Sequence, residues 1–389
     1  ILQNLSDYHL EKQVLGEGAF GKVRLATSSR TGHRVAVKVI KRKKLNDRAE
    51  VLLQREVKHH EKVRAPFPRI FFTPSPPPSA LPDVCPARAN KVWQQLPPSP
   101  LSSDERCFEQ PISDWENCDI PEWLWPHWCH SLGDQATAIA QLLQQRAPVF
   151  LRVNLLKATV DQACVSLSDA GYDVSPHPDV PTALCVTGRT AGLQTTEAYV
   201  DGLIELQDAH SQASVTLLDP RQNGPILDYC TGGGGKSLAL AAWLGGPVHA
   251  HDVNPGRMVD LPVRAKRANA QISSRTKEQF APDYGVVFCD APCSGSGSWR
   301  RDPEGKWALT QDQLDALIST QREILSDAAK LVAPDGRLVY ATCSVLVCEN
   351  QDQIDWFTVQ NPTWRVETQK QWIPSAQGDG FFASVLTQL

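Results

Sequence analysis

The carboxyl-terminal half of the chain alternates short apolar runs with stretches that have helical spacing. The apolar runs that predict strands are 226–228, 248–253, 284–290 and 337–342. The stretches that predict helices are 237–244 and 314–332. Strands separated by helices are typical of βαβ units, in which the strands run parallel. The pattern therefore predicts an α/β fold built on a mainly parallel sheet.

Three stretches of different character precede this half. Residues 8–64 are basic and strand-like, and residues 65–110 are rich in proline. Proline-rich sequence of this kind is typical of a linker or a disordered segment. Folded structure resumes with a predicted helix near 135–145 and a predicted strand at 149–154. We therefore expect four parts, at residues 8–64, 65–110, 111–215 and 216–389.

Composition narrows the class of protein only slightly. The 389 residues have a formal net charge of −4 and are 41% hydrophobic, as is ordinary for a globular protein. With this charge, any nucleic acid would have to bind a local basic patch. The 11 cysteines lack the paired C-x-x-C spacing of structural zinc sites, so we predict no metal site and a reduced, cytoplasmic protein. No apolar run is long enough to predict a membrane span, and the initial Ile1 leaves the true start of the chain open.

A glycine-rich loop follows the first strand of this half. It has the sequence DYCTGGGGKS, from Asp228 to Ser237, and leads directly into a predicted helix. Glycines allow the backbone to approach a ligand closely at a helix amino terminus. Asp252 lies about twenty residues further on, after the next strand, where a carboxylate can bind ribose hydroxyls. The pattern indicates an adenosine-containing cofactor; the alternative is a phosphate-binding P-loop, but that motif has a glycine where this chain has Cys230.

Two cysteines each follow a predicted buried strand. Cys293 lies in the sequence DAPCSGSG, and Cys343 lies in YATCS. The carboxyl ends of strands are where α/β proteins bind ligands and place reactive groups. Free cysteines are nevertheless among the most buried residues, so inert packing is the alternative for any one of them. We assign packing to Cys289 and Cys348, and reactivity to Cys293 and Cys343 because of the motifs around them.

Four pieces in this half resemble the RNA cytosine-5 methyltransferases of the Sun/Nop class, in particular the bacterial 16S ribosomal RNA enzymes. The resemblance covers about residues 121–389, and its pieces are 227–237, 251–254, 289–307 and 340–350. It implies a Rossmann-like methyltransferase sheet that is preceded by a small α+β RNA-binding segment. It also implies S-adenosyl-L-methionine as the cofactor and RNA, in particular ribosomal RNA, as the partner.

The resemblance also implies the role of each site residue. It makes Cys343 the nucleophile and Cys293 the residue that assists release. It places Asp290 at the cytosine edge or the cofactor, and Lys236 near the base. Covalent catalysis is needed because carbon 5 of cytosine is a poor nucleophile until a thiolate adds to carbon 6. In that fold the strands that end at Asp228, Asp290 and Thr342 are neighbours, so their ends share one crevice, and the target base must leave its stack to enter it.

The candidate residues form three sets. The catalytic candidates are Cys343, Cys293, Asp290 and Lys236. The candidates for cofactor binding are Cys230, Thr231, Gly232, Gly233, Gly234, Gly235, Lys236, Asp252 and Asp290. The candidates for RNA contact are Arg300 and Arg301, which we expect to bind phosphate or a base, although such a pair is otherwise a solvated surface feature.

Two positions depart from the family pattern. Thr231-Gly232-Gly233 stands where many relatives have Ala-Ala-Pro, which makes the loop more flexible without preventing its approach to the cofactor. Relatives also carry an acid after the third strand that contacts the adenine. The corresponding stretch, 272–282, offers only Glu278 at an uncertain register, so that contact is left unassigned.

Residues 8–64 resemble the opening of a eukaryotic-type protein kinase lobe. Gly16, Gly18, Gly21 and Val23 match its glycine-rich loop, and Lys38 matches the lysine that pairs with phosphates. No His-Arg-Asp or Asp-Phe-Gly sequence follows, so phosphoryl transfer is not expected. We interpret the segment as a partial kinase lobe that retains an ATP-binding motif, joined to the rest in a spliced or misjoined gene product.

The favoured function is therefore methylation of carbon 5 of cytosine in RNA. One alternative is a non-catalytic RNA-binding or assembly factor, which would bind the cofactor without turnover. The intact set of four catalytic candidates argues against that alternative. A second alternative is that the protein is a nucleotide-binding kinase remnant, and this interpretation depends on residues 8–64 alone.

Overall fold

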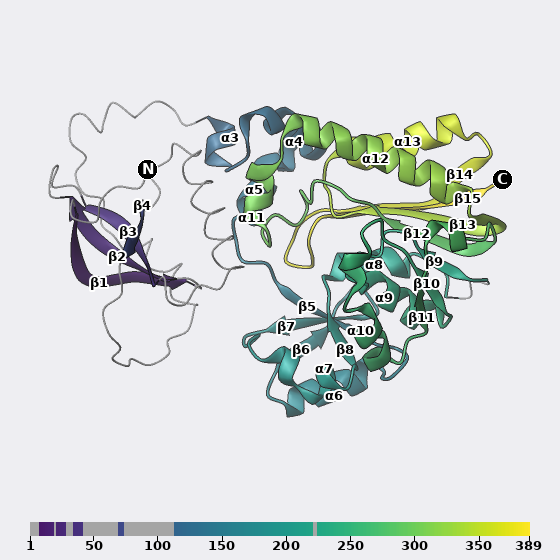
Figure 1. The fold of residues 1–389 in the computed structure, drawn as a ribbon, viewed down its shortest axis with the longest axis horizontal. Helices are drawn as coiled ribbons and strands as arrows, with labels where there is room; N and C mark the ends of the chain where they lie inside the picture. Colours follow the sequence, from purple (N-terminus) through teal and green to yellow (C-terminus); the bar gives the residue numbers. More distant parts are fainter. Residues whose placement is uncertain (1–7, 19–20, 29–33, 42–68, 74–112, 221–223) are drawn as a thin grey trace. The chain divides into compact units, whose positions relative to one another are not determined.

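The computed structural model describes residues 8–18, 21–28, 34–41, 69–73, 113–220 and 224–389 (Figure 1). The chain divides into two compact units, Ile1–Gln110 and Pro111–Leu389. The four-part division by sequence remains a prediction, and most of its proline-rich second part lies outside the described residues. Among the described residues, no helix combines the length and the apolar character needed to cross a membrane.

The described part of the first unit is a four-stranded sheet. Its strands are β1 (Tyr8–Gly18), β2 (Gly21–Ser28), β3 (Arg34–Lys41) and β4 (Arg69–Thr73). β1, β2 and β3 pair antiparallel in sequence order, and β4 pairs parallel with β3. In this ladder Gly16 pairs with Val23, Gly18 with Gly21, and Val23 also with Lys38. The pairing gathers the candidate nucleotide-binding positions on adjacent strands, while the kinase resemblance and ATP binding remain predictions.

The second unit begins with an α+β segment. Its helices are α3 (Asp114–Asn117), α4 (Trp125–Leu132), α5 (Ala136–Leu143), α6 (Val160–Asp169), α7 (Glu197–Val200) and α8 (Ala209–Thr216). Its strands are β5 (Val149–Val153), β6 (Asp173–Pro176), β7 (Ala183–Thr187) and β8 (Ile204–Leu206). The strands form an antiparallel sheet in the order β6-β7-β5-β8. α6 buries Ala163 and Leu167 against Leu151 and Leu184 of this sheet, as its apolar spacing requires.

The larger sheet of this unit carries the candidate site. Its strands are β9 (Ile226–Asp228), β10 (Val248–Ala250), β11 (Ile272–Ser274), β12 (Tyr284–Asp290), β13 (Val332–Thr342), β14 (Trp364–Trp372) and β15 (Phe381–Gln388). Its helices are α9 (Gly235–Leu244), α10 (Leu261–Ala268), α11 (Pro303–Ala308), α12 (Gln311–Ala329) and α13 (Gln351–Gln360). Short 3₁₀ turns, among them η10 (Val347–Glu349), complete the segment.

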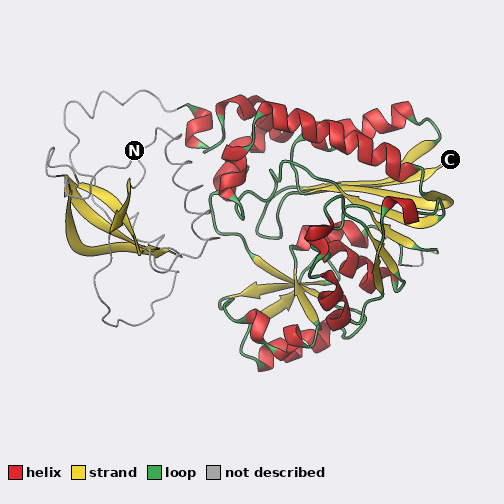
Figure 2. Ribbon diagram, in the orientation of Figure 1, coloured by secondary structure: helices red, strands yellow, loops and turns green. Residues whose placement is uncertain are grey.

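The order of the larger sheet is β11-β10-β9-β12-β13-β15-β14. β15 runs antiparallel to β13 and β14, and the other pairings are parallel. Helices α12 and α13 cover one face and α8 and α9 the other, so the sheet is the middle of three layers (Figure 2). The strand order reverses between β9 and β12, and open α/β sheets bind ligands outside the carboxyl ends of the strands at such a point.

β12 illustrates why the sheet forms from this sequence. Val286 and Phe288 pack against α8 and α9, while Val287 and Cys289 pack against α12 and α13. Because both faces are covered, the strand is a continuous apolar run and does not alternate with polar residues. Cys289 is fully buried in this packing, which confirms its predicted role as a core residue.

The fold confirms the predicted α/β class with its mainly parallel methyltransferase sheet, and it differs from the sequence prediction in three places. The predicted strand 248–253 ends at Ala250, so Asp252 lies in a loop. β13 begins at Val332 and not at Arg337, because the turn-like sequence Pro334-Asp335-Gly336 forms an irregularity within the strand. The β14–β15 hairpin was not predicted, since most residues of β14 are polar and at least partly exposed.

Candidate active site

The loop between β9 and α9 folds back on the carboxyl end of β9. Thr231 donates its N–H to the carbonyl of His251 at 2.8 Å and its hydroxyl to the carbonyl of Asp228 at 3.0 Å. Gly234 donates its N–H to the carbonyl of Thr231 at 2.9 Å, with a φ of 84° that favours glycine. A Cβ at Gly234 would also overlap the side chain of Leu261. The predicted cofactor-binding run 230–236 thus forms one tight turn that depends on its glycines.

Asp252 binds this loop from the loop that follows the neighbouring strand, β10. Its Oδ2 accepts the N–H of Gly232 at 2.8 Å, and its Oδ1 accepts the N–H of Asn254 at 2.9 Å. Arg257 lies 3.6 Å from the same carboxylate. The structure therefore places the predicted ribose-binding acid beside the glycine loop, at the reversal point of the sheet.

A second acid at this edge, Asp228, was not among the predicted site residues. It is fully buried, its Oδ2 accepts the hydroxyl of Ser237 at 2.6 Å, and its Oδ1 has no partner within the described residues. Burial raises the pKa of Asp228 to about 7, since a buried carboxylate loses its hydration. Oxygen acceptors that follow two adjacent strands, beside a loop with four consecutive glycines, fit the amino and hydroxyl groups of the predicted S-adenosyl-L-methionine.

The two predicted thiols meet at the ends of adjacent strands. The Sγ atoms of Cys293 and Cys343 are 3.5 Å apart, although 50 residues separate them in sequence. β12 and β13 pair in parallel up to Asp290 and Ala341, so the two loops that follow leave the sheet side by side. Both cysteines are half-buried, whereas the alternative of inert packing predicts a fully enclosed side chain. The structure brings together the two cysteines that the sequence predicted to be reactive.

The other two catalytic candidates form an ion pair next to the thiols. Lys236, near the start of α9, lies with its Nζ 3.0 Å from Oδ2 of Asp290 at the end of β12. The same Nζ lies 4.6 Å from the centre of the Phe381 ring. Lys236 is almost fully buried, and Asp290 is partly exposed, so the ion pair forms part of the crevice wall.

Electrostatics distinguish the two thiols. The hydrogen bond from Cys293 lowers the pKa of Cys343, and burial and Asp290 oppose this effect while the positive charge of Lys236 supports it. The same hydrogen bond, together with burial and the charge of Glu349, raises the pKa of Cys293. The two shifts have opposite directions, so the pair favours the thiolate at Cys343 and the protonated thiol at Cys293. Cys230 differs from Cys343, because burial raises the pKa of its thiol.

The predicted RNA contacts, Arg300 and Arg301, both bind Asp379 in the connection between β14 and β15. Nε of Arg300 lies 2.5 Å from Oδ1 of Asp379, and Arg301 pairs with Oδ2. Arg301 also lies 3.1 Å from Asp208. The side chain of Arg300 is only 3% exposed, whereas that of Arg301 is 39% exposed. Asp379 had no role in the sequence prediction, because its partners are nearly eighty residues away.

Glu349 is a further residue that the sequence reasoning passed over. It is fully buried, and it accepts hydrogen bonds from Ser294 and Ser344, the residues that follow the two thiols. Its position within the matching piece 340–350 was visible in the sequence, but nothing there indicated which residues it contacts.

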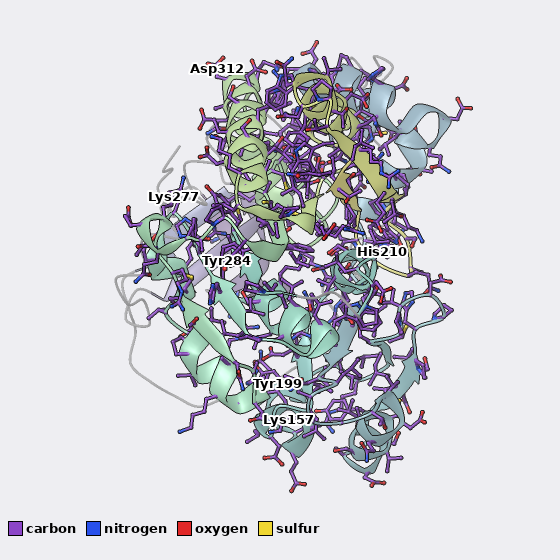
Figure 3. All side chains as sticks on the ribbon, turned by 90° about the vertical axis from the view of Figure 1, so that its right-hand side faces the viewer. Lys157, Tyr199, His210, Lys277, Tyr284 and Asp312 are labelled. Carbon is purple, nitrogen blue, oxygen red and sulfur yellow. The ribbon has the colours of Figure 1, made fainter. Side chains whose placement is uncertain are left out.

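Contacts also join the α+β segment to the glycine loop. Arg152 of β5 donates to the carbonyl of Gly235 at 2.6 Å. Arg264 of α10 donates to the carbonyl of Gly233 and pairs with Glu205 of β8. Lys157 and Tyr199, labelled in Figure 3, both contact Arg267 of α10, with Lys157 3.1 Å from its carbonyl oxygen. The α+β segment thus contacts and stabilises the glycine loop from outside the larger sheet.

Separate family models match the α+β segment and the segment that forms the larger sheet. The family model described as 16S rRNA methyltransferase RsmB/F matches residues 215–387, and a ferredoxin-like domain model of the same proteins matches residues 120–191. Ribosomal RNA small subunit methyltransferase B of Salmonella arizonae is 30% identical over an alignment of 350 positions, which covers 84% of this chain and 81% of the relative. The chain belongs to the RsmB/F family. The corresponding protein of Serratia proteamaculans is 32% identical over 285 residues, or 69% of this chain and 66% of that protein.

Solved structures have the fold of this RsmB/F protein. The crystal structure of PH0851 superposes with a TM-score of 0.66 and 28% identity, covering 78% of this chain and 72% of that one. A methyltransferase homologue from Pyrococcus horikoshii superposes with a TM-score of 0.63 and 21% identity, over 74% of this chain and 100% of that one, and this second likeness shows the fold alone.

Family membership confirms the main predictions for this RsmB/F protein. It is an RNA cytosine-5 methyltransferase that uses S-adenosyl-L-methionine and acts on RNA.

Proposed function

We propose that this RsmB/F protein methylates carbon 5 of a cytosine in ribosomal RNA through a covalent bond between Cys343 and carbon 6. The observation that carries the proposal is the pair of thiols 3.5 Å apart at the ends of adjacent strands. S-adenosyl-L-methionine supplies an electrophilic methyl group when it is bound. The relatives named for ribosomal RNA methylation support the substrate class.

The Cys343 thiolate adds to carbon 6 and breaks the C5–C6 double bond, so that carbon 5 becomes nucleophilic. Once carbon 5 carries the methyl group, its proton passes to a base, the double bond re-forms and the bond to sulfur breaks. Cys293, which donates a hydrogen bond to the Cys343 sulfur, stabilises the departing thiolate. Cys343 is thus the nucleophile, and Cys293 assists release.

Lys236 keeps a positive charge beside Cys343, which favours the thiolate. Asp290 holds Lys236 in place with one carboxylate oxygen and is partly exposed to the crevice, where it can contact the cytosine edge or the cofactor. Residues 230–236 and Asp252 bind the cofactor, and the target base has to be unstacked to reach the thiols. Of the two candidates for RNA contact, Arg301 is exposed enough to reach RNA, and the buried Arg300 helps to position it through their shared partner, Asp379.

The cellular location that we propose is cytoplasmic, because the mechanism needs two adjacent thiols in the reduced state.

The test is methyl transfer from labelled cofactor to ribosomal RNA by the full-length chain. Cys343→Ala is expected to reduce 5-methylcytosine formation by on the order of 10⁴-fold or more, since the nucleophile is lost. Cys293→Ala is expected to stop turnover and to leave a stable covalent RNA adduct, seen as a protein band of reduced mobility. Cys348→Ala, a neighbouring half-buried cysteine outside the pair, is the control and should keep its activity. Methylation by Cys343→Ala would refute the assigned nucleophile, and the absence of an adduct with Cys293→Ala would refute the release role.

A further inference from the structure

Glu349 is a buried carboxylate that binds both of the loops that carry the thiols. It accepts the N–H of Ser294 at 2.8 Å and the hydroxyl of Ser294 at 2.5 Å. It accepts the hydroxyl of Ser344 at 2.6 Å and the side-chain amide of Gln321, from α12, at 3.1 Å. Ser294 follows Cys293 directly, and Ser344 follows Cys343 directly. One side chain therefore connects the residues next to both sulfur atoms.

The two loops depend on this connection to different degrees. Cys343 directly follows β13, where Thr342 pairs with Phe382 of β15, so the sheet itself holds the nucleophile. Cys293 lies three residues beyond the end of β12, in a loop whose main chain bonds to β13 through Ala291 and to the Cys343 loop through Gly297. Further bonds join the loops, such as the one between the hydroxyls of Ser296 and Ser344 at 2.8 Å, but Glu349 accepts from Ser294, the residue next to Cys293.

A buried carboxylate is costly to remove from water unless hydrogen bonds saturate it. Glu349 meets that condition, because it accepts four hydrogen bonds. Its negative charge acts on Cys293, whereas the positive charge of Lys236 acts on Cys343. Two opposite charges thus act on the two sulfurs, and this arrangement favours a proton on Cys293 and a thiolate at Cys343. A neutral side chain of the same shape would keep the packing and lose this asymmetry.

We propose that Glu349 is a positioning residue that holds the Cys293 loop against the Cys343 loop, so that Cys293 stays within hydrogen-bond reach of the nucleophilic sulfur. The role rests on the proposed two-thiol mechanism and deepens it. Glu349 touches neither the RNA nor the cofactor in this role; it acts through Ser294 and Ser344. Its loss should impair release, in which Cys293 takes part directly, more than attack, in which Cys343 is the nucleophile.

The distance between the sulfurs can be tested without RNA or cofactor, by disulfide formation. Diamide takes two electrons and two protons from a pair of thiols and is reduced to the hydrazine, while one S–S bond of about 2.05 Å forms. The Cys293–Cys343 disulfide is identified by peptide mapping of the full chain. We expect its formation to be at least about tenfold slower in Glu349→Gln than in the unmodified protein. Glu323→Gln, the same change at an exposed position of α12, is the control and should not alter the rate.

Glu349→Gln also removes a negative charge, which changes the reactivity of Cys293 in a known direction. Removing the negative charge beside Cys293 lowers the pKa of that thiol, which by itself would speed its oxidation and its alkylation by iodoacetamide. A slower disulfide together with a faster alkylation of Cys293 therefore indicates a lost position and not a lost reactivity. A disulfide rate equal to that of the unmodified protein would overturn the proposal.

Catalysis supplies the second readout. With ribosomal RNA and labelled cofactor, Glu349→Gln should keep most of its first-turnover methyl transfer and lose about tenfold or more in steady-state turnover, with a covalent adduct accumulating. Equal loss in both phases would contradict a role in release. Ser294→Ala removes one of the bonds to Glu349 while keeping its charge, and it should show the same pattern with a smaller effect even if Glu349→Gln folds poorly.

The outcomes separate this role from the proposed function. If the unmodified protein forms the disulfide quickly and Glu349→Gln does not, while Cys343→Ala still methylates RNA, the positional coupling stands and the assigned nucleophile falls. If Cys343→Ala is inactive and both proteins form the disulfide equally fast, the nucleophile stands and the role of Glu349 falls.

Discussion

The cofactor edge and the thiol edge of the crevice are held in different ways. The cofactor edge is one continuous loop, 228–237, joined by Asp252, and main-chain hydrogen bonds hold most of it. The thiol edge consists of the loops that carry Cys293 and Cys343, 50 residues apart in sequence. Buried side chains from η10 and α12 hold those loops together. A ligand loop can therefore be specified locally, whereas a pair of reactive sulfurs requires contacts from the whole domain.

The two edges should also differ in the substitutions that they tolerate. Main-chain hydrogen bonds persist through most side-chain changes, so the cofactor edge should be sensitive chiefly at its glycines and at its acid. The thiol edge has few exposed groups and many buried polar ones, and each of these loses its partner if a neighbour is changed. Variants at one edge should therefore leave the other edge measurably intact.

The largest effect is expected at the thiol edge, from Gly297→Ala. A Cβ at Gly297 would overlap the main-chain carbonyl of Gly380, which cannot rotate away, so the loop that carries Cys293 has to move. We expect turnover to fall by roughly 100-fold, equivalent to about 2.7 kcal/mol, with cofactor affinity unchanged. Steady-state methylation and calorimetric cofactor binding measure the two quantities. The control is Gly246→Ala, whose Cβ would make only an ordinary 3.6 Å contact with Ile226.

A smaller effect is expected at the cofactor edge, from Gly234→Ala. The left-handed φ of 84° and the overlap with Leu261 together should cost about 2 kcal/mol of cofactor binding, or roughly 30-fold in Kd. Alkylation of Cys343 should proceed at the usual rate. Gly245→Ala is the control, because this position has the same left-handed backbone, with a φ of 72°, but no neighbour in contact. It measures the effect of backbone strain outside the cofactor site. Loss of thiol reactivity in Gly234→Ala would show that the two edges are not independent.

Asp252→Asn tests the acid that follows β10 and binds the glycine loop. The change removes a charged acceptor, and hydrogen bonds to charged groups contribute about 1.5–3 kcal/mol, so the Kd for the cofactor should rise about tenfold. Asp260→Asn makes the same change at an exposed position nearby and should leave the Kd unaltered. Equal affinities in both variants would remove Asp252 from the cofactor site.

The smallest effects are shifts in the pH dependence of Cys343 alkylation. Thiolate rises with pH through the pKa, which lies below that of an ordinary cysteine here, so alkylation should reach half its maximum at a correspondingly low pH. Asp290→Asn removes a negative charge and should move this midpoint down by about one pH unit, whereas Lys236→Gln should move it up by a similar amount. Midpoints that move in the same direction in both variants would contradict the assigned electrostatics.

The sequence predicted much of this site, because its signals are local. Four glycines before a helix predict a close backbone approach, and cysteines that directly follow apolar runs predict thiols at strand ends. β12 was predicted with its observed bounds, since a strand buried on both faces is a continuous apolar run. β14 was missed, because its polar residues do not differ from those of a loop.

Other residues could not be assigned from the chain alone. Arg300 and Arg301 look like a free basic pair in sequence, and their pairing with Asp379 depends on a hairpin nearly eighty residues later. Asp228 looks like an ordinary strand end, but complete burial raises its pKa to about 7. Burial is a property of the packed molecule, and no short motif encodes it.

The sequence by itself determined the α/β sheet, the glycine loop, the two thiols and the resemblance that the family comparison confirmed. Each of these depends on residues adjacent in the chain, whose spacing and chemistry act over a few positions. Only the tertiary structure decided that the sulfurs lie 3.5 Å apart, that the opposite charges of Lys236 and Glu349 act on different sulfurs, and that Asp379 anchors the arginines. Hydrogen bonds and charges act over a few ångströms in space, and folding alone brings such distant residues within that range.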